Sequence, residues 1–423
     1  MKTIKKIRNF ILLSLICIFF IKMPVQADNV KVVIDPGHGG ENLGAQWEGR
    51  DEKDILLTVA KAMKEELEKY EGITVYMTRD EDKDMSLQER ASFADKKNAD
   101  FLYSLHFNMS EYHTLYGTEI WVSAFGEGYS KGYAFGEIYL NHMTDLGLYS
   151  RGVKTRLNKQ GTDYYGVIRA CTEYEIPSAI LEHCYLDRPE DAGRHETEEK
   201  LKELGRLDAT AVAKYFKLSS KELGVDYSDY QVSEVWVPTE PVKPDLTPPE
   251  NCEITSVSTD EEKGTLTFSL IADDGDSGIL YYAYSIDGGI NYSELQKWRE
   301  DVSEDGQVHK SIDIPYGKQI KLVCRVLNGY DIESESESVS VNAIFKQEVT
   351  EAVSEEVVVE DKTKEIISTE PDELYIIQRA EEKPIDNIKL VLCIVGTSLL
   401  VSMFFVLVLS KAMTKKKKRK HRK

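Results

Sequence analysis

Cysteine is scarce and scattered in this chain of 423 residues. Two of the six cysteines, Cys17 and Cys393, lie in apolar segments, and the other four are spread over the body of the chain. Such a distribution excludes a disulfide framework, so hydrophobic cores must hold the fold together. The hydrophobic share of 41% is sufficient for such cores, and the length indicates two or three domains rather than one.

Basic residues are in short supply over most of the chain. Between residue 27 and Ser410 there are 39 basic residues against 73 acidic ones, although the chain as a whole has a net charge of only −20. A body with this charge will not bind nucleic acid non-specifically, so nucleic acid is excluded as a partner.

The two ends carry the long apolar runs. A basic start, an apolar run over 10–21 and small residues up to Ala27 predict a secretory signal peptide at 1–27, with an uncleaved anchor as the alternative. Near the other end, 21 uncharged residues predict a transmembrane helix at 389–411, and no wall-sorting motif of the L-P-x-T-G type precedes it. The basic residues of 412–423 should stay in the cytoplasm, so we expect a single-pass protein of the cell membrane with its body outside.

Four segments lie between these ends. Strands alternate with helices over 28–218, which predicts an α/β domain with a mixed central sheet flanked by helices. A proline-rich linker follows at 219–250, and short alternating strands over 251–345 predict a small all-β sandwich. The stretch 346–388 is acidic and poor in aromatic residues, so we expect a disordered linker there.

The α/β pattern is specific enough to predict individual elements. Its expected strands are 30–34, 73–77, 101–106, 117–122 and 178–182, and its expected helices are 55–67, 86–97, 132–143 and 201–216. In the second domain, weak motifs resemble bacterial immunoglobulin-like or fibronectin-like modules. There, Asp273-Asp274-Gly275-Asp276 is interpreted as a plain acidic turn, with a calcium site as the alternative, and Cys252 and Cys324 are expected not to pair.

Two histidines and two glutamates lie at key points of this pattern. The stretch Val32–Gly40 reads V-V-I-D-P-G-H-G-G, so His38 follows a buried strand, at the edge where open α/β sheets bind ligands. His106 and Glu182 end two further apolar strands, and Glu52 directly precedes a helical pattern. Two histidines and one glutamate form a catalytic zinc set with a fourth position open, and the remaining glutamate would act as general base.

These blocks, taken in order, resemble the zinc-dependent N-acetylmuramoyl-L-alanine amidases. The resemblance covers about 30–216 and rests on I-D-P-G-H-G-G, then E-K, the arginine of L-Q-E-R-A-S-F-A-D, S-L-H-F-N and P-S-A-I-L-E. It implies one zinc ion per catalytic domain, held by His38, Glu52 and His106, with Glu182 as the catalytic glutamate. It also implies a hydrolase that uses zinc-activated water to cleave the amide between muramic acid and the first alanine of the peptidoglycan stem.

The chain departs from the family pattern just after Glu182. Tyr185 fits that pattern, whereas Asp187 or Arg188 stands where the family commonly has asparagine. Cys184 is close enough to be a thiolate ligand, although a buried small residue is the preferred interpretation.

Further residues are candidates for contacts with the substrate or with the ligands. Arg90 occupies the family's arginine slot, where we expect it to hold loop carboxylates or carbonyls, with a substrate contact as the alternative. Asn108 is expected to orient its loop or contact substrate. The polar segment 151–166 ends in Tyr164 and Tyr165, and we expect it to rim the cleft and contact glycan or stem peptide, unless it is a solvated loop.

Two other functions remain open at this stage. One is a wall-binding or adhesion protein with a decayed catalytic domain, and the other is a zinc peptidase that cuts within stem peptides. The expected partners are peptidoglycan and the membrane, while a protein regulator cannot be read from the residues. The acidic body should be repelled at long range from an anionic cell wall, unless cations or the membrane tether intervene.

Overall fold

The computed structural model describes residues 29–345, which lie within one compact unit. The expected signal peptide, the acidic segment 346–388, the transmembrane helix at 389–411 and the basic tail lie outside the described residues. Within 29–345, no helix combines the length and the apolar character needed to cross a bilayer.

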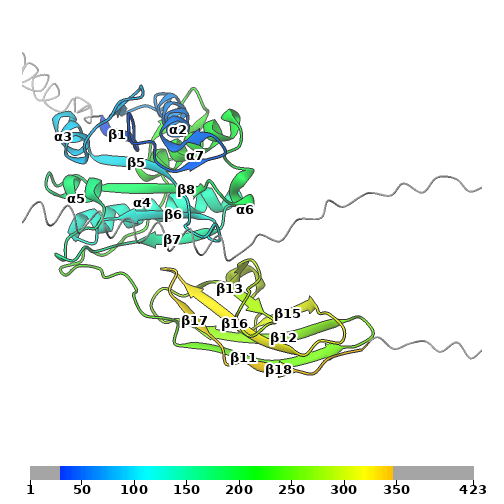
Figure 1. Ribbon diagram of the computed structural model, residues 1–423. Helices are drawn as coiled ribbons and strands as arrows, with labels where there is room; N and C mark the ends of the chain where they lie inside the picture. Colours follow the sequence, from blue (N-terminus) through cyan, green and yellow to red (C-terminus); the bar gives the residue numbers. More distant parts are fainter. Residues whose placement is uncertain (1–28, 346–423) are drawn as a thin grey trace, which may run out of the picture. The chain divides into compact units, whose positions relative to one another are not determined.

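A six-stranded mixed sheet forms the centre of the first part of the chain (Figure 1). Its strands, in spatial order, are β4 (Ile73–Met77), β1 (Val30–Pro36), β5 (Phe101–Asn108), β8 (Ser178–Tyr185), β6 (Thr118–Val122) and β7 (Ser150–Lys154). The pair β6 and β8 is antiparallel, and the other neighbouring pairs are parallel. The predicted mixed central sheet is therefore confirmed.

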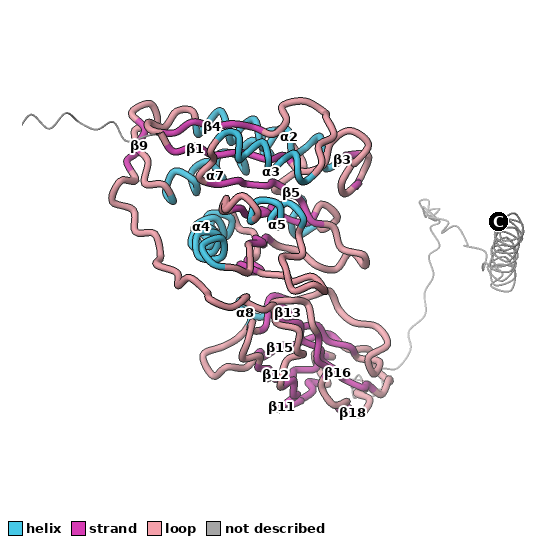
Figure 2. Tube along the Cα trace, turned by 90° about the vertical axis from the view of Figure 1, so that its left-hand side faces the viewer, coloured by secondary structure: helices cyan, strands magenta, loops and turns pink. Residues whose placement is uncertain are grey.

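Helices cover both faces of this sheet and can be followed in Figure 2. They are α2 (Glu52–Leu67), α3 (Leu87–Lys97), α4 (Gly126–Asp145), α5 (Gly166–Thr172), the short α6 (Pro189–Ala192) and α7 (Glu198–Tyr215). Because side chains alternate along a strand, Ile34 packs with the core of α2, α4 and α7, whereas Val33 packs with that of α3 and α5. Both faces are buried, which explains the nearly continuous apolar strands in the sequence.

The strands β5 and β8 are longer than their apolar runs predict. We expected them to end at His106 and Glu182, but they continue to Asn108 and Tyr185, which pair with each other after an irregularity. Polar residues remain in these strands because they have partners inside the domain. One example is the Asn108 amide, which donates a hydrogen bond to Glu119.

The expected polar loop at 151–166 begins instead as β7, a strand at the edge of the sheet. Two of its basic residues, Arg151 and Lys154, are buried, because both form ion pairs with the buried carboxylate of Glu119. The alternative of a solvated loop therefore does not apply to these first residues, and the expected substrate contact of the segment stays a prediction.

The proline-rich stretch 219–250 lies against the α/β domain. After the small pair of strands β9 (Ser219–Ser220) and β10 (Val225–Asp226), side chains of the stretch pack on the sheet core: Tyr230, Val232, Val235 and Val242. Val242 also donates its amide to the Ala124 carbonyl and accepts from the Thr155 hydroxyl. The stretch is therefore attached to the domain along its length.

Residues 251–345 form a β-rich region of two antiparallel sheets around a shared core. One sheet holds β11 (Asn251–Asp260), β12 (Thr265–Asp273) and β15 (Val308–Asp313). The other holds β14 (Gln296–Lys297), β13 (Ile279–Ser285), β16 (Ile320–Asn328), β17 (Glu333–Glu335) and β18 (Val339–Val341), with the short helix α8 (Trp298–Asp301) after β14. Cys252 and Cys324 are both free thiols here, and Asp274 accepts hydrogen bonds from the Ser277 and Gly278 amides of its own turn.

Candidate metal centre

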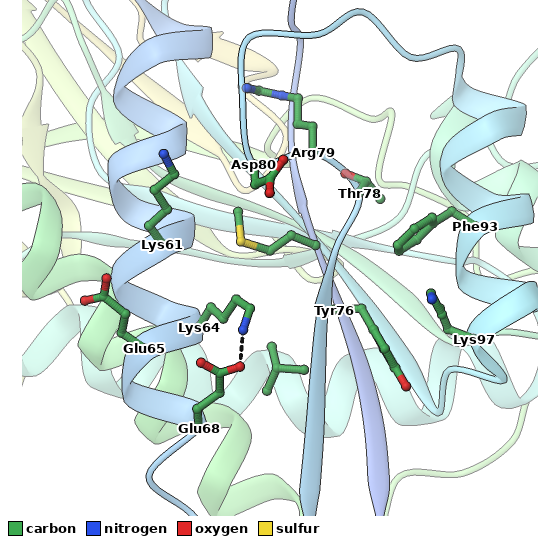
Figure 3. A pocket seen from close by; sticks show the side chains of 12 residues that line it. Lys61, Lys64, Glu65, Glu68, Tyr76, Thr78, Arg79, Asp80, Phe93 and Lys97 are labelled. Carbon is green, nitrogen blue, oxygen red and sulfur yellow. Dashed lines mark hydrogen bonds and ion pairs between the residues drawn. The ribbon is translucent and has the colours of Figure 1, made fainter.

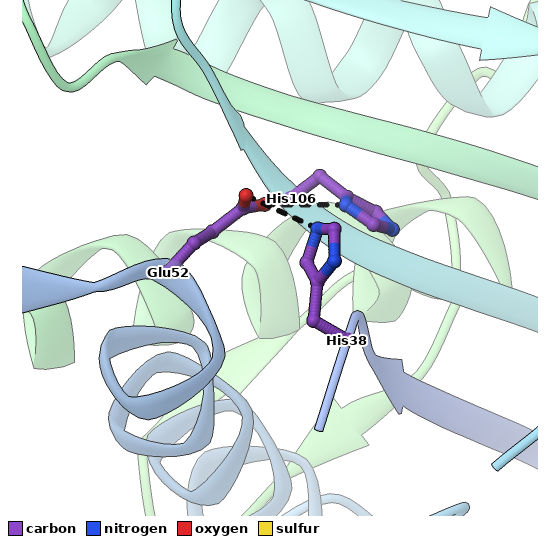
Figure 4. A group of neighbouring side chains, drawn as sticks. All are labelled: His38, Glu52 and His106. Atoms are coloured by element: carbon purple, nitrogen blue, oxygen red, sulfur yellow. Dashed lines mark hydrogen bonds and ion pairs between the residues drawn. The ribbon is translucent and has the colours of Figure 1, made fainter. Parts of the chain in front are cut away.

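Three side chains far apart in the sequence converge at the carboxyl ends of β1 and β5 (Figure 4). Glu52 Oε2 lies 3.1 Å from His38 Nε2, and Glu52 Oε1 lies 3.2 Å from His106 Nδ1. One ligand atom from each of the three residues lies within 4.8 Å of the others. The structure therefore brings together the three residues that the sequence predicts as metal ligands.

Glycines make room for this cluster. A Cβ atom on Gly37 would lie 2.3 Å from His106 Cε1, and one on Gly44 would lie 2.5 Å from Glu52 Oε2. His38 itself has a positive φ of 59°, and its Nδ1 lies 2.9 Å from Asn42 Oδ1, so its Nε2 is left to face Glu52. The close approach of backbone and rings explains the glycine-rich turn after β1.

Glu52 is held in its ionised form. It is the first residue of α2, after the small hairpin of β2 (Gln46–Trp47) and β3 (Arg50–Asp51), and it accepts hydrogen bonds from the backbone amides of Ala45 and Phe107. Burial alone would raise its pKa, but hydrogen bonds from His106 and His38 outweigh burial and hold the pKa well below the usual range. Its position at a helix N-terminus also favours the negative charge.

Two arginines fix the loop that carries His38. Arg90, on α3, forms an ion pair with Asp35 at 2.6 Å and donates to the carbonyls of Pro36 and His38. Arg79 donates to the carbonyls of Pro36 and Gly37. Arg90 thus makes the loop contacts expected from the sequence. The similar contacts of Arg79, which lies in the T-R-D turn after β4, were not predicted.

Glu182 lies on β8, opposite His106 on one side and Glu119 on the other. Its Oε2 atom is buried and has no hydrogen-bond partner among the described residues. Burial raises the pKa of this carboxyl well above its usual range, and the negative charges of Glu52 and Glu119 add to the effect. A buried carboxyl with a raised pKa and an open oxygen is suited to accept and return a proton.

A second buried histidine supports His106 from behind. Nδ1 of His183 lies 3.0 Å from the His106 carbonyl, and its Nε2 lies 2.8 Å from Asp208 on α7. Both side chains are fully buried. The sequence does not reveal this pair, because its members are 25 residues apart and belong to different elements.

Glu119 is the centre of a buried polar cluster beside Glu182. Its carboxylate accepts hydrogen bonds from Arg151 Nε at 2.9 Å, Lys154 Nζ at 2.7 Å, Asn108 Nδ2 at 3.0 Å and Trp121 Nε1 at 3.2 Å. Asn108, a candidate for substrate contact, is therefore engaged with Glu119. The signal that we missed was a glutamate in the middle of an apolar strand.

The two candidate tyrosines differ in their surroundings. The Tyr164 side chain is 46% exposed. The Arg156 guanidinium lies over the Tyr164 ring, 3.9 Å from the ring centre. Tyr165 is more buried, with its ring 5.0 Å from that of Trp121, and burial followed by the charges of Glu182 and Glu119 raises its pKa. Neither tyrosine belongs to the group of metal-ligating side chains.

The departure from the family pattern at Asp187 has a local explanation. Asp187 is buried, and its Oδ2 lies 2.5 Å from Nδ1 of His113 and accepts a hydrogen bond from the Ser110 amide. The carboxylate thus orders the loop after β5. Cys184 is buried in β8 and is not part of the group of metal-ligating side chains, which favours the interpretation as a small core residue.

A groove of about 470 Å³ lies elsewhere, beside the edge strand β4 (Figure 3). Its walls come from α2, α3 and β4 and include Lys61, Tyr76, Phe93 and Lys97. None of the three metal-ligating residues lines it. The groove is therefore separate from the candidate metal centre.

The first part of the chain is similar to known proteins. Residues 32–214 match the N-acetylmuramoyl-L-alanine amidase family. The chain is 30% identical over 192 residues to the sporulation-specific N-acetylmuramoyl-L-alanine amidase of Bacillus subtilis, covering 45% of this chain and 69% of the relative. It is 28% identical over 197 residues to the N-acetylmuramoyl-L-alanine amidase CwlM of Bacillus licheniformis, covering 45% and 70%. Among solved structures, Cwp6 from Clostridium difficile matches with 32% identity and a TM-score of 0.42, over 45% of this chain and 30% of that one.

The family match and the Bacillus subtilis relative define the class: this chain belongs to the N-acetylmuramoyl-L-alanine amidase family. The family domain is the α/β domain, and the β-rich region lies outside the matched residues.

Proposed function

We propose that this protein is a peptidoglycan hydrolase that cleaves the amide bond between N-acetylmuramic acid and L-alanine of the stem peptide. The observation that carries the proposal is the group His38, Glu52 and His106 beside the buried, open carboxyl of Glu182, in a domain of the amidase family. The similarity to N-acetylmuramoyl-L-alanine amidases of Bacillus subtilis and Bacillus licheniformis supports the same reaction.

The residues at the site fit a zinc ion. Two imidazole nitrogens and one ionised carboxylate are the donor set of catalytic zinc, and glycine at 37 and 44 leaves the space that the rings need. His38, Glu52 and His106 would hold the ion. When bound, zinc supplies a Lewis acid that polarises a carbonyl and activates water at neutral pH.

Glu182 and Glu52 have different environments and therefore different roles. Hydrogen bonds from two histidines keep the pKa of Glu52 low, so it stays charged and serves as a ligand. Burial keeps the pKa of Glu182 high, so this carboxylate readily takes a proton from the attacking water and delivers it to the leaving amine of alanine.

The protein would act outside the cell while attached to the membrane. The uncharged run at 390–410 and the basic residues after it support a single-pass anchor with a cytoplasmic C-terminus, and the segment 1–27 supports secretion. The catalytic domain would comprise residues 28–218, and a sandwich-like module would comprise residues 251–345. Such a tether restricts hydrolysis to wall near the membrane.

The reaction is tested by mass spectrometry of peptidoglycan digested with the full-length protein. We expect stem peptides that begin with L-alanine, together with glycan that ends in free lactyl groups. Glu182→Gln should keep bound zinc but lose cleavage, whereas Glu65→Gln, on the exposed face of α2, should behave like the wild type. Cuts within the stem peptide, or a Glu182→Gln protein with normal activity, would overturn the proposal.

A further inference from the structure

A buried ion-pair chain connects the β-rich region with the strand beside Glu182. Asp331 lies in the turn between β16 and β17, and both of its carboxylate oxygens accept hydrogen bonds from Arg151 Nη2, at 2.9 and 2.7 Å. The Nε atom of the same arginine donates to Glu119 at 2.9 Å. The Arg151 side chain is 1% exposed and the Asp331 side chain 30%, so Arg151 is buried while its partner in the β-rich region is partly exposed.

The charges in this row of ion pairs balance only when Asp331 is included. Arg151 and Lys154 both approach the same oxygen of Glu119, which leaves one positive charge in excess within the α/β domain. Asp331 supplies the missing negative charge. Buried charges are tolerated only when they are paired and fully hydrogen-bonded, so the orientation of Arg151 depends on the β-rich region.

Other residues of the same turn and of β13 also contact Arg151, Lys154 and their neighbour Thr155. The Tyr281 hydroxyl accepts from Arg151 Nη1 at 3.1 Å. The Tyr330 hydroxyl accepts from the Thr155 amide at 3.1 Å, and the Tyr330 ring lies 5.6 Å from Lys154 Nζ. The turn therefore contacts both basic residues that hold Glu119.

Apolar packing stabilises the contact between the α/β domain and the β-rich region. A separate buried cluster joins Tyr116 and Tyr149 of the α/β domain to residues of the β-rich region. These are Leu280, Tyr281 and Ala283 on β13, Leu295 just before β14 and Leu327 on β16. Within it, the Tyr149 hydroxyl donates to the Leu280 carbonyl at 2.7 Å and the Tyr116 hydroxyl to the Leu295 carbonyl at 3.2 Å. Buried aromatic residues with satisfied hydroxyls are typical of a stable interface.

Glu119 connects the contact between Arg151 and Asp331 to the residues around Glu182. It faces Glu182 across the antiparallel pair of β6 and β8, and it holds the amide of Asn108, two residues beyond His106. A change in the orientation of Glu119 would therefore shift the strands on both sides of Glu182.

We propose that Asp331 is a positioning residue for the reaction, which acts through Arg151 and Glu119 on the placement of Glu182. The β-rich region is thus part of the catalytic unit and not only a spacer. This inference rests on the proposed function, because it assigns Asp331 to the reaction at Glu182.

The test compares the Asp331→Asn substitution with Glu333→Gln in the full-length protein. Glu333 is an exposed residue two positions away, so it is a matched control. With a soluble muramyl-peptide substrate, we expect Asp331→Asn to lower kcat about tenfold with KM changed less than about twofold, because orientation at the reacting centre is lost while substrate contacts remain. Asp331→Glu should restore part of kcat, and Glu333→Gln should match the wild type.

A double-mutant cycle separates positioning from general destabilisation. If Asp331 acts through Glu119, the combined Asp331→Asn and Glu119→Gln protein should lose no more kcat than Glu119→Gln alone. Losses that multiply, or a folded Asp331→Asn protein with wild-type kcat, would overturn the inference. Thermal melting and zinc content show whether each variant is folded.

If Asp331→Asn does not fold, Tyr281→Phe tests the same arginine, since it removes the hydroxyl that accepts from Arg151 and donates to the Tyr116 carbonyl. It should lower kcat several-fold without an additional loss in the Glu119→Gln background, and independent effects would contradict the inference. A wild-type protein that releases no L-alanine stem peptides would instead refute the proposed function, and with it the reaction that Asp331 serves.

Discussion

Gly37 lies directly against the imidazole of His106. No side chain fits between them, because a Cβ atom at position 37 would lie 2.5 Å from Nε2 and 2.8 Å from Nδ1 of the ring. The turn after β1 and the end of β5 therefore share one close contact, and the ring position depends on the absence of a single methyl group.

The first prediction follows from that contact. Gly37→Ala should displace His106 and weaken zinc binding by about tenfold or more, the range expected when the support of a ligand is lost. Metal affinity can be measured by competition with a chelator that has a known zinc affinity. Gly193→Ala is the control, since a Cβ there meets nothing within 4 Å, and equal affinities of the two variants would contradict the prediction.

The second prediction concerns the pair behind the site. Asp208→Ala leaves the fully buried His183 without its ion-pair partner and should lower the free energy of unfolding by roughly 3–5 kcal/mol. Urea denaturation followed by far-UV circular dichroism measures this loss. The exposed Asp95, replaced by alanine, should change the stability little, and a similarly small effect at Asp208 would show that His183 is satisfied without it.

The third prediction concerns acid stability. Burial, with the neighbouring charge of Arg50, lowers the pKa of His195 to about 4, so this ring is neutral in the folded state near pH 7. Because the folded pKa lies below the ordinary 6.5, its contribution to stability is present above pH 6.5 and is lost as the pH falls towards about 4. Melting temperatures at pH 7 and pH 4.5 should differ less for His195→Gln than for the wild type, and an unchanged difference would remove His195 as the cause.

The fourth prediction tests substrate contact at the exposed tyrosine. Tyr164→Ala should raise KM several-fold and leave kcat nearly unchanged, if its ring and the adjacent Arg156 contact glycan or stem peptide. Steady-state kinetics with soluble muropeptides measures both constants. Tyr112, which is 78% exposed and has no proposed role, provides the matched alanine control, and an unchanged KM at Tyr164 would exclude the contact.

The sequence predicts the candidate site residues but not the residues that support them. His38, Glu52, His106 and Glu182 could be predicted because each lies beside an apolar strand or helix whose pattern is local. By contrast, the burial of Arg151 was not predicted, because a charged residue is buried only when a partner is near, and its partners Glu119 and Asp331 are 32 and 180 residues away.

The lengths of β5 and β8 illustrate the same limit. Polar residues after His106 and Glu182 indicated that both strands end there, yet Asn108 and His183 continue them with buried partners. The helix α3 was easier, because its capping box between Ser86 and Glu89 is a local signal that the structure reproduces.

The position of β8 has a consequence for the order of events during folding. This strand is the last of the six to be synthesised, yet it lies between β5 and β6 and is the only link between the two halves of the sheet. The three candidate metal ligands precede it by more than 70 positions, whereas Glu182 is part of it. An incomplete chain can therefore contain the three candidate ligand residues but neither a joined sheet nor Glu182. On the proposed function, activity would begin only when β8 is inserted.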